Sequence, residues 1–302
     1  PFLVRVTGWG LTFVINGAIG IIWAIIWIAW FKDQPGQHKK VNQQELDYIM
    51  KGIPENGGDG KKVQLTQILT SSTMLLTMFQ YMASNITFFI SFTWLLPYLV
   101  SQWGPGAEIY APIPLVLGMF AQWTSGWLMT VIYDRGFSVM SRKLPAVAGF
   151  SIAVAGLLAI TLVNNPSPLV FVLLFSVAVF GVEMTISPSW SLCMDIGGDK
   201  SGTVSATMNM VGNIGSALSA IVFPFFIANV TIPFFAASKG TANSFFVFAA
   251  IMNLLAIFAW MGIKPGKSAG KIFAKQARYR LIIFLLVIFL ITAGALLYNF
   301  FK

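Results

Sequence analysis

Long runs of apolar residues, each long enough for a membrane-spanning helix, dominate the pattern along this chain. The hydrocarbon core of a bilayer is about 30 Å thick and takes about 20 residues of helix to cross. Polar turns separate the runs, so the pattern predicts an all-α integral membrane protein. The predicted spans are residues 8–31, 73–100, 110–133, 145–163, 168–194, 202–228, 244–263 and 281–299.

Polar residues are unevenly distributed among these spans. In hydrocarbon, polar side chains belong at helix contacts or along a hydrated cavity. Cavity lining and helix packing both explain polar stripes, and the sequence leaves the two open. The stripes lie in the spans 73–100, 110–133, 168–194 and 202–228. The stripe of the first of these spans consists of Gln80, Ser84, Thr87, Ser91, Trp94 and Tyr98, with Asn85 at its edge.

Glu183 is the only ionisable residue well inside a predicted span. A carboxylate there costs several kcal/mol unless it is hydrated, paired or protonated. At helical spacing Ser187 and Trp190 share its face, and Pro188 frees a backbone carbonyl nearby. Glu183 is therefore either a proton carrier or substrate contact, or a protonated contact between helices.

The composition excludes a soluble enzyme. Hydrophobic residues make up 57% of the chain and charged residues 10%, against about 25% charged in soluble domains. The net charge of +9 comes from basic residues in loops beside the spans, which is the positive-inside pattern and not a nucleic-acid surface. The single Cys193 forms no intrachain disulfide, and His38 has no metal-type neighbours. No phosphate loop and no Ser/His/Asp set occurs, so we expect neither an enzyme nor a metal or cofactor beyond a coupling ion.

The basic residues also predict the orientation. Sixteen of the 19 Lys and Arg residues lie in one set of alternating loops, whereas Arg5, Lys239 and Lys302 lie on the other side. Because Lys and Arg are biased to the cytoplasmic side of short loops, the first span runs from outside to inside. The connection 32–72 is then cytoplasmic.

The spacing of the spans predicts four parts. We expect residues 1–31 to be the end of an N-terminal bundle, 32–72 a cytoplasmic loop, 73–263 a six-helix bundle, and 264–302 a basic linker with an extra transmembrane helix. One helix before a long linker and six after it is what remains when a two-bundle transporter loses most of its first bundle. Position 1 is Pro and not Met, and we expect the chain to be cut at its N-terminus.

Three segments carry a resemblance to a known family. The first has Gly8-Trp9 at a helix start, FKDQP at its end and Glu45-Leu46-Asp47-Tyr48-Ile49 in the following loop. The second is SNITFFISFTWLLPYL at 84–99, and the most specific is SPSWSLCMDIGGDKSGTVSATMNMVGNIGS at 187–216. With these segments the chain resembles transporters of the major facilitator superfamily, in the anion:cation symporter branch that includes hexuronate, glucarate and galactonate permeases and sialin.

This resemblance implies a twelve-helix fold in which residues 1–31 hold the end of helix 5 and helix 6. It also implies alternating access and an inner gate between helices 8 and 9, where Thr130 replaces the family's Asp. The gate residues here would be Asp134, Arg135 and Arg142. Phe89 stands where the family often has Tyr. The substrate contacts expected on this basis are Asn85, Phe89, Ser187, Trp190, Asn209 and Asn213. The polar stripes themselves add Trp94, which would flank the substrate with Trp190, and Glu183, which would tune protonation or substrate choice.

The sequence thus predicts a symporter of a small organic anion, such as a hexuronate, glucarate or galactonate, driven by H⁺ or Na⁺. Its partners would be the substrate, the lipid bilayer and the missing N-terminal bundle, in a bacterial inner (plasma) membrane and without nucleic acid. The alternative is a degenerate half-transporter that acts as a structural or regulatory membrane subunit. A membrane-embedded enzyme would need clustered His or acidic residues at one interface, and the sequence has none.

Overall fold

The computed structural model describes residues 2–52, 65–230, 242–265 and 281–286, and these ranges contain helices, turns and no strand. Seven of the described helical segments are long and apolar enough to cross a membrane. The all-α prediction is confirmed, and the protein is an integral, multi-pass membrane protein. The predicted span 281–299 is helical over 281–286, and its remainder lies outside the described residues. Two compact units, Pro1–Gly57 and Gly58–Lys302, divide the chain.

The first unit begins with α1 (Phe2–Trp30), whose helical backbone is interrupted at Gly8. Gly8 has φ of 76°, in the left-handed region that glycine adopts without steric cost. An interruption frees backbone carbonyls, which need donors in a membrane. The hydroxyl of Thr12 donates to Gly8 O at 2.7 Å and that of Thr7 to Leu3 O at 2.8 Å. The predicted helix start at residue 8 coincides with this interruption.

The segment predicted as a loop, 32–72, contains regular structure. It holds the short 3₁₀ helix η1 (Pro35–Gln37), α2 (Gln43–Gly52) and α3 (Leu65–Thr70). Asn42 begins α2 because its side-chain oxygen accepts the Glu45 backbone N–H at 2.8 Å, as an N-cap residue does. The Gly-rich stretch that predicted a flexible linker falls on residues 53–64, outside the described part.

The second unit is a bundle whose membrane-spanning elements are connected in chain order. Helix α3 belongs to this unit. The other elements are α4 (Ser72–Phe88), α5 (Ile90–Thr93), α6 (Leu95–Trp103), η2 (Ala107–Tyr110), α7 (Ile113–Asp134), α8 (Ser138–Leu162), α9 (Pro168–Met184), α10 (Ile186–Gly197), η3 (Gly198–Lys200), α11 (Ser201–Asn229) and α12 (Asn243–Gly262).

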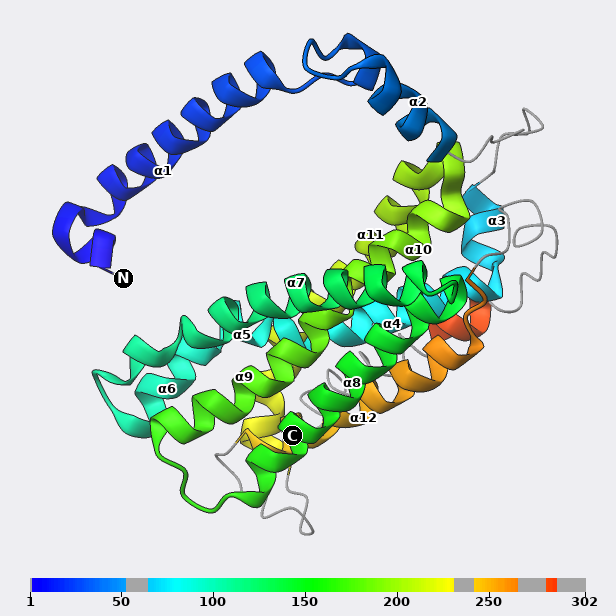
Figure 1. The fold of residues 1–302 in the computed structure, drawn as a ribbon. Helices are drawn as coiled ribbons and strands as arrows, with labels where there is room; N and C mark the ends of the chain where they lie inside the picture. Colours follow the sequence, from blue (N-terminus) through cyan, green and yellow to red (C-terminus); the bar gives the residue numbers. More distant parts are fainter. Residues whose placement is uncertain (1, 53–64, 231–241, 266–280, 287–302) are drawn as a thin grey trace. The chain divides into compact units, whose positions relative to one another are not determined.

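Neighbouring helices of this bundle form a ring. Helix α4 packs against α11 and α12, α12 against α8, α8 against α9, and α9 against α7, while α10 contacts α11. Figure 1 shows α7, α9 and α8 side by side, with α12 next to α8. Helices distant in the chain are therefore adjacent, and α4 meets both of the last two helices.

Glycines allow α8 and α9 to approach until their backbones touch. A β-carbon at Gly156 would lie 2.6 Å from Ala178 N, and one at Gly149 would lie 2.5 Å from Gly181 O. Small residues at helix contacts are the usual means of close packing in membranes. This contact keeps the two helices at a fixed separation.

Two spans predicted as single helices are interrupted. The span 73–100 consists of α4, α5 and α6, with junctions at Phe89 and Trp94, and 168–194 consists of α9 and α10, which meet at Thr185. Proline explains the interruption between α9 and α10. Pro188 has no N–H to donate to the carbonyl of the residue four positions earlier, so the helical hydrogen bond is missing there.

Donors from other helices satisfy two carbonyls that prolines release. Pro188 leaves Met184 O without its helical donor, and the Ser125 hydroxyl of α7 donates to it at 2.6 Å. Pro224, inside α11, leaves Ala220 O, which accepts the indole N–H of Trp94 at 3.0 Å. These two helix irregularities are therefore also inter-helix contacts.

The predicted start of the span 145–163 is wrong, because α8 begins at Ser138. The predicted span began where the apolar run begins, whereas Pro145 lies inside the helix. The helix continues N-terminally through Arg142 and Lys143, beyond its apolar part. This extension places both basic residues on a helix and not in a loop.

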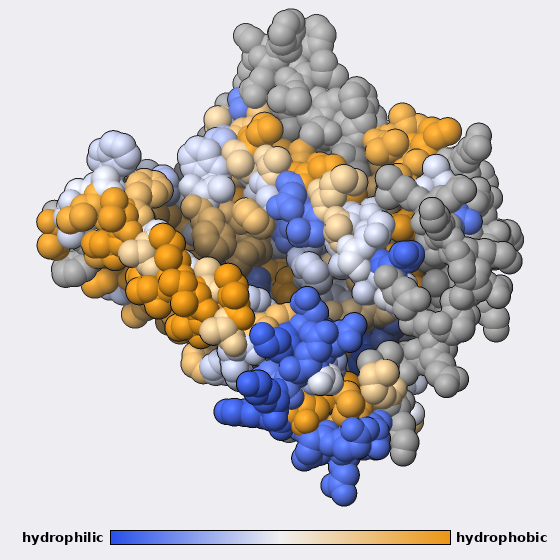
Figure 2. Space-filling view, turned by 90° about the horizontal axis from the view of Figure 1, so that it is seen from above, coloured by the Kyte–Doolittle hydropathy of each residue, from blue (hydrophilic) through white to orange (hydrophobic). Residues whose placement is uncertain are grey.

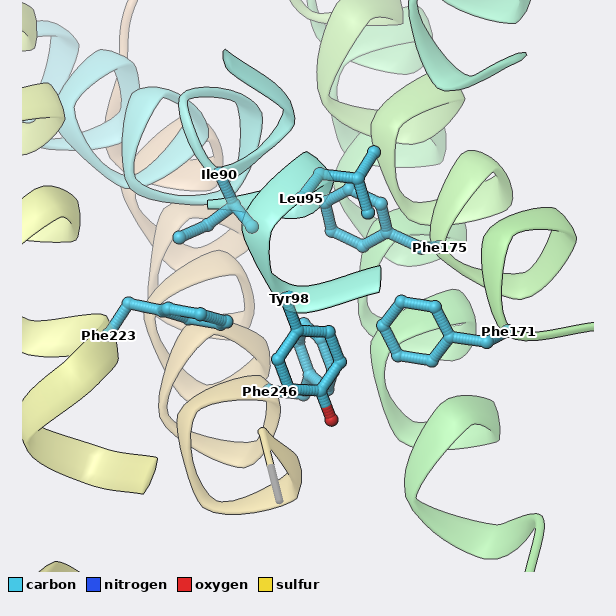
Figure 3. Close-up of a pocket in the computed structure, with 7 residues that line it drawn as sticks. All are labelled: Ile90, Leu95, Tyr98, Phe171, Phe175, Phe223 and Phe246. Carbon is cyan, nitrogen blue, oxygen red and sulfur yellow. The ribbon is translucent and has the colours of Figure 1, made fainter. Parts of the chain in front are cut away.

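Aromatic side chains close one end of the bundle. In Figure 3, Tyr98 stands between Phe171 and Phe223, and Ile90, Leu95, Phe175 and Phe246 complete the cluster. The side chains pack so closely that no water fits between them. The Tyr98 hydroxyl accepts the Ala242 N–H at 3.2 Å. Tyr98, predicted as part of a polar stripe, therefore closes the bundle interior.

The surface agrees with a lipid environment. Apolar residues form broad areas in Figure 2, and strongly hydrophilic residues gather in smaller ones. Large apolar side chains are exposed along α7, where Trp123 is 70% and Trp127 66% exposed. A soluble protein rarely exposes contiguous apolar surface of this kind.

Candidate functional site

Tyr81 of α4 lies at the centre of a group of residues from three helices. The indole N–H of Trp190 on α10 donates to the Tyr81 hydroxyl at 3.3 Å, and the two rings meet edge to face with centroids 6.5 Å apart. On the opposite side Tyr81 packs against Gly212 of α11, and the amide of Asn85, one turn further along α4, packs there too. The structure thus brings the predicted residues Asn85 and Trp190 to one place.

Helix α11 presents the two predicted asparagines beside this group. Asn213 follows Gly212 directly and is exposed, while Asn209 is half-buried one turn earlier. The Asn213 amide donates to Asn209 O at 3.0 Å. Gly212 is required here because a β-carbon would lie 2.7 Å from Tyr81 Cε1 and 2.8 Å from Asn85 Nδ2. The close approach leaves Asn213 at the edge of the Tyr81 group.

Glu183 lies at the contact of α9 and α7, with 4% of its surface exposed. The Gln122 side-chain amide donates a hydrogen bond to Glu183 Oε2. Gly118 makes room for the carboxyl group, since a β-carbon there would lie 3.0 Å from Glu183 Cγ. Glu183 also interacts electrostatically with Tyr81. The carboxyl group is therefore connected both to α7 and to the Tyr81 group.

A cavity of about 330 Å³ opens between α7, α8 and α10. The hydroxyl of Ser187, a predicted contact, faces this cavity and donates to Gln122 O at 3.4 Å. The lining consists of Gly126, Met129, Thr130, Tyr133, Arg142, Ser187 and Ser191. Hydroxyl groups and one guanidinium therefore dominate the polar part of this cavity.

Arg142 lines the cavity and forms an ion pair with Asp195. Its Nε lies 3.0 Å from Asp195 Oδ2, and its guanidinium lies 5.9 Å from the centroid of the Tyr133 ring. The other two predicted gate residues, Asp134 and Arg135, are exposed at the end of α7. Arg142 was predicted from the sequence, but its pairing with Asp195 was not.

The turn after α7 explains why Asp134 and Arg135 point outward. Phe137 N–H bonds to Ile132 O at 3.2 Å and Gly136 N–H to Tyr133 O at 2.8 Å. With Gly136 at φ of 85°, this is the Schellman arrangement in which a left-handed glycine ends a helix. The chain then turns directly into α8.

Phe89 and Trp94 lie at the helix junctions of the interrupted span. Phe89 is half-buried between α4 and α5, and its ring contacts Phe88 and Phe92. Trp94 stacks on Phe223 and donates to Ala220 O. Trp94 thus connects the α5–α6 junction to α11, whereas Trp190 contacts Tyr81.

The predicted polar stripe of the span 73–100 faces other helices for much of its length. Gln80, 0% exposed, donates to Ser189 Oγ at 3.0 Å and accepts the Trp260 N–H at 3.1 Å. Thr87 accepts a hydrogen bond from Asn253 at 2.8 Å. In this part of the bundle, the polar residues of the stripe hold helices together and do not line a cavity.

Tyr81 and Asp195 are the residues that sequence reasoning missed. Tyr81 precedes Asn85 by four positions, so helical spacing places both on one face. A tyrosine in the middle of a span, away from the headgroup level where the ring is usually found, was the available indication. The ion pair between Arg142 and Asp195 could be predicted only from the packing of α8 against α10, and no local sequence pattern shows that packing.

Comparisons with known proteins give a consistent result. The sequence profile of the Major Facilitator Superfamily matches residues 1–220. The chain is 29% identical to the hexuronate transporter of Bacillus subtilis (strain 168), over 87% of the chain and 60% of the relative. It is 28% identical to the probable galactarate/D-glucarate transporter of the same organism, over 86% and 57%, and 27% identical to the D-galactonate transporter of Escherichia coli O6:H1, over 74% and 54%.

The chain therefore spans slightly more than half the length of these curated relatives. The relatives are named as transporters, which confirms the expectation that the chain is not an enzyme. The profile match and these names also confirm the family resemblance.

Proposed function

The chain belongs to the Major Facilitator Superfamily, and we propose that it forms the substrate-facing C-terminal bundle of a symporter for a small organic anion. Sugar acids are the favoured class, because relatives at 27–29% identity are named for hexuronate, galactarate, glucarate and galactonate. The coupling ion would be H⁺ or Na⁺, and the membrane a bacterial inner membrane. An N-terminal bundle would cover the open face of α7, α10 and α11.

One observation carries the proposal: three helices converge on Tyr81 to form a site with an aromatic face and amide groups. The Trp190 ring offers an apolar surface for the C–H face of a sugar. The amides of Asn85, Asn209 and Asn213 donate and accept hydrogen bonds, as a polyhydroxylated acid requires. Such sites near the middle of interrupted helices, at the junction of two bundles, are the general pattern of secondary transporters.

The other predicted residues fit this proposal in different ways. Ser187 would extend the site toward the cavity, and Arg142 would supply positive charge at the cavity end. Phe89 and Trp94 would act by setting the path of the interrupted span beside Asn85. Asp134 and Arg135 remain predicted gate residues on the exposed end of α7.

The test is uptake of labelled glucuronate and galactonate into proteoliposomes that contain the complete gene product of which this chain is part. We expect Trp190→Ala and Asn213→Ala to reduce uptake at least tenfold. Trp123→Ala and Asn229→Ala are matched controls, since Trp123 is an exposed residue of α7 and Asn229 bonds within its own helix. Well-folded protein without uptake of any sugar acid would refute the proposal and favour the regulatory-subunit alternative.

A further inference from the structure

Two series of small and polar residues face each other along α7 and the α9–α10 segment. On α9 and α10 the series is Glu183, Ser187, Ser191 and Asp195, at steps of four residues. On α7 it is Gly118, Gln122, Gly126 and Thr130, again at steps of four. Residues four apart share one face of a helix, so each series forms a continuous stripe.

Direct contacts show that the two stripes meet. At one end, Gln122 bonds to Glu183, and Gly118 leaves space for its carboxyl group. One turn on, the Ser187 hydroxyl donates to Gln122 O at 3.4 Å. Beyond this point the stripes separate and enclose the cavity of about 330 Å³. A water takes about 30 Å³ of liquid volume, so the cavity has room for several waters.

We propose that this cavity and the stripes beside it form a water path that carries protons between the end of the bundle marked by Arg142 and Asp195 and a proton-binding site at Glu183. The positive-inside rule places that end in the cytoplasm. The consequence for coupling rests on the proposed transport function. The path and the proton site themselves do not depend on it.

The groups along the path suit this role. The Ser187 and Thr130 hydroxyls donate to Gln122 O and Gly126 O, so their oxygens can accept from water, and the Ser191 hydroxyl can donate or accept. The Gln122 amide donates to Glu183 Oε2, an atom that accepts whether the carboxyl group is ionised or protonated. Carboxyl groups inside membranes recur in proton relays, where their cost is compensated by function.

Glu183 is 4% exposed and does not itself line the cavity, and Gln122 and Ser187 connect it to the cavity wall. From α4, Tyr81 interacts with it electrostatically. From α8, the residues that pack against Gly181, two positions before Glu183, are Gly149 and Ala153, which do not titrate. Lys143, near the start of α8, bonds to Met261 O.

The cavity mouth carries charges of both signs. There Arg142 is paired with Asp195, so a proton entering the cavity does not meet an uncompensated positive charge.

Cysteine accessibility tests the path without requiring transport. Cys193 and any further cysteine of the complete gene product are first replaced, and single cysteines are introduced by Ser187→Cys, Ser191→Cys and, as control, Ser176→Cys. Ser176 is 0% exposed and bonds within α9. A charged thiol reagent that does not cross membranes is added to the cytoplasmic face. We expect labelling at 187 and 191 at least tenfold faster than at 176, and equal rates at all three positions would overturn the path.

Infrared difference spectroscopy tests the proton site. We expect the carbonyl band of a protonated carboxylic acid that disappears as the pH on the cytoplasmic face is raised, and that is absent from Glu183→Gln. A band that persists in Glu183→Gln, or no pH-dependent band, would refute the assignment.

In proteoliposomes, Glu183→Gln should lose uptake driven by a proton gradient but keep exchange of labelled for unlabelled sugar acid. If Glu183→Gln loses exchange as well, the role of Glu183 is not limited to proton coupling, and this part of the proposal is refuted. Absence of any transport in the unmodified protein would refute the proposed function, whereas the labelling and infrared results would still decide the water path.

Discussion

The contact between α8 and α9 allows a sharp test of the packing. Gly181→Ala would place a β-carbon 2.5 Å from Gly149 O and 2.9 Å from Ala153 Cα, and closer still to Ala153 N. All three atoms belong to the backbone of α8, so no side-chain rotation relieves the clash. Ordinary contact begins at 3.4 Å, so the separation from Gly149 O must grow by about 0.9 Å (3.4 less 2.5).

Forcing two packed elements apart typically costs about 1–3 kcal/mol. Replacing glycine by alanine within a helix also contributes roughly 1 kcal/mol in the opposite direction. Gly126→Ala provides that second effect alone, because a β-carbon there meets nothing within 4 Å. The difference between the two variants therefore isolates the cost of the contact.

Cys193 provides the assay. It is the single cysteine of this chain and is 0% exposed, so a thiol-reactive fluorophore reports its release on unfolding. At roughly 2–4 °C for each kcal/mol in a domain of 150–250 residues, we expect Gly181→Ala to unfold roughly 2–12 °C below Gly126→Ala in detergent. Equal midpoints for the two variants would show that α8 and α9 do not touch as described.

Two further predictions use the same assay. Trp94→Phe removes the donor to Ala220 O, a half-buried bond, and should cost about 1 kcal/mol, the usual net contribution of a hydrogen bond. The exposed Trp123→Phe should leave the midpoint unchanged, and equal midpoints for the two variants would contradict the bond. Arg142→Gln breaks a partly exposed ion pair and should cost less than about 1 kcal/mol, yet raise KM for a sugar acid several-fold in the complete gene product. Lys143→Gln, whose ammonium points to another helix, should leave KM unchanged.

The positions of most helices follow from hydropathy alone. The spans 202–228 and 244–263 differ from α11 and α12 by one residue at each end. The interruptions at Phe89 and Trp94 were not predicted, because hydropathy is insensitive to backbone geometry. The start of α8 was misplaced for a related reason, since a helix does not end where its apolar face ends.

The site was predicted less completely than the fold. Periodicity places Ser187 and Glu183 on one face, and this face is the one that meets α7. The aromatic contact of Trp190 with Tyr81, and the space that Gly212 leaves for it, depend on how α4, α10 and α11 meet. Contacts between helices distant in the sequence are not encoded in any one segment, and the site consists of such contacts.

The distribution of buried contacts indicates how this bundle moves. Gln80 joins α4 to α10 and α12 by hydrogen bonds, and each bond broken by sliding one helix past another would cost about 1–3 kcal/mol. The glycine contact between α8 and α9 has no slack, because packed interiors transmit displacement and do not absorb it. The cavity beside Ser187 is bounded by weaker contacts, a hydrogen bond of 3.4 Å from Ser187 to Gln122 O and the approach of the Arg142 guanidinium to the Tyr133 ring at 5.9 Å. We therefore expect the proposed alternating access to come from rotation of the bundle as one body, with Trp190 and Asn213 carried along and only the cavity changing shape.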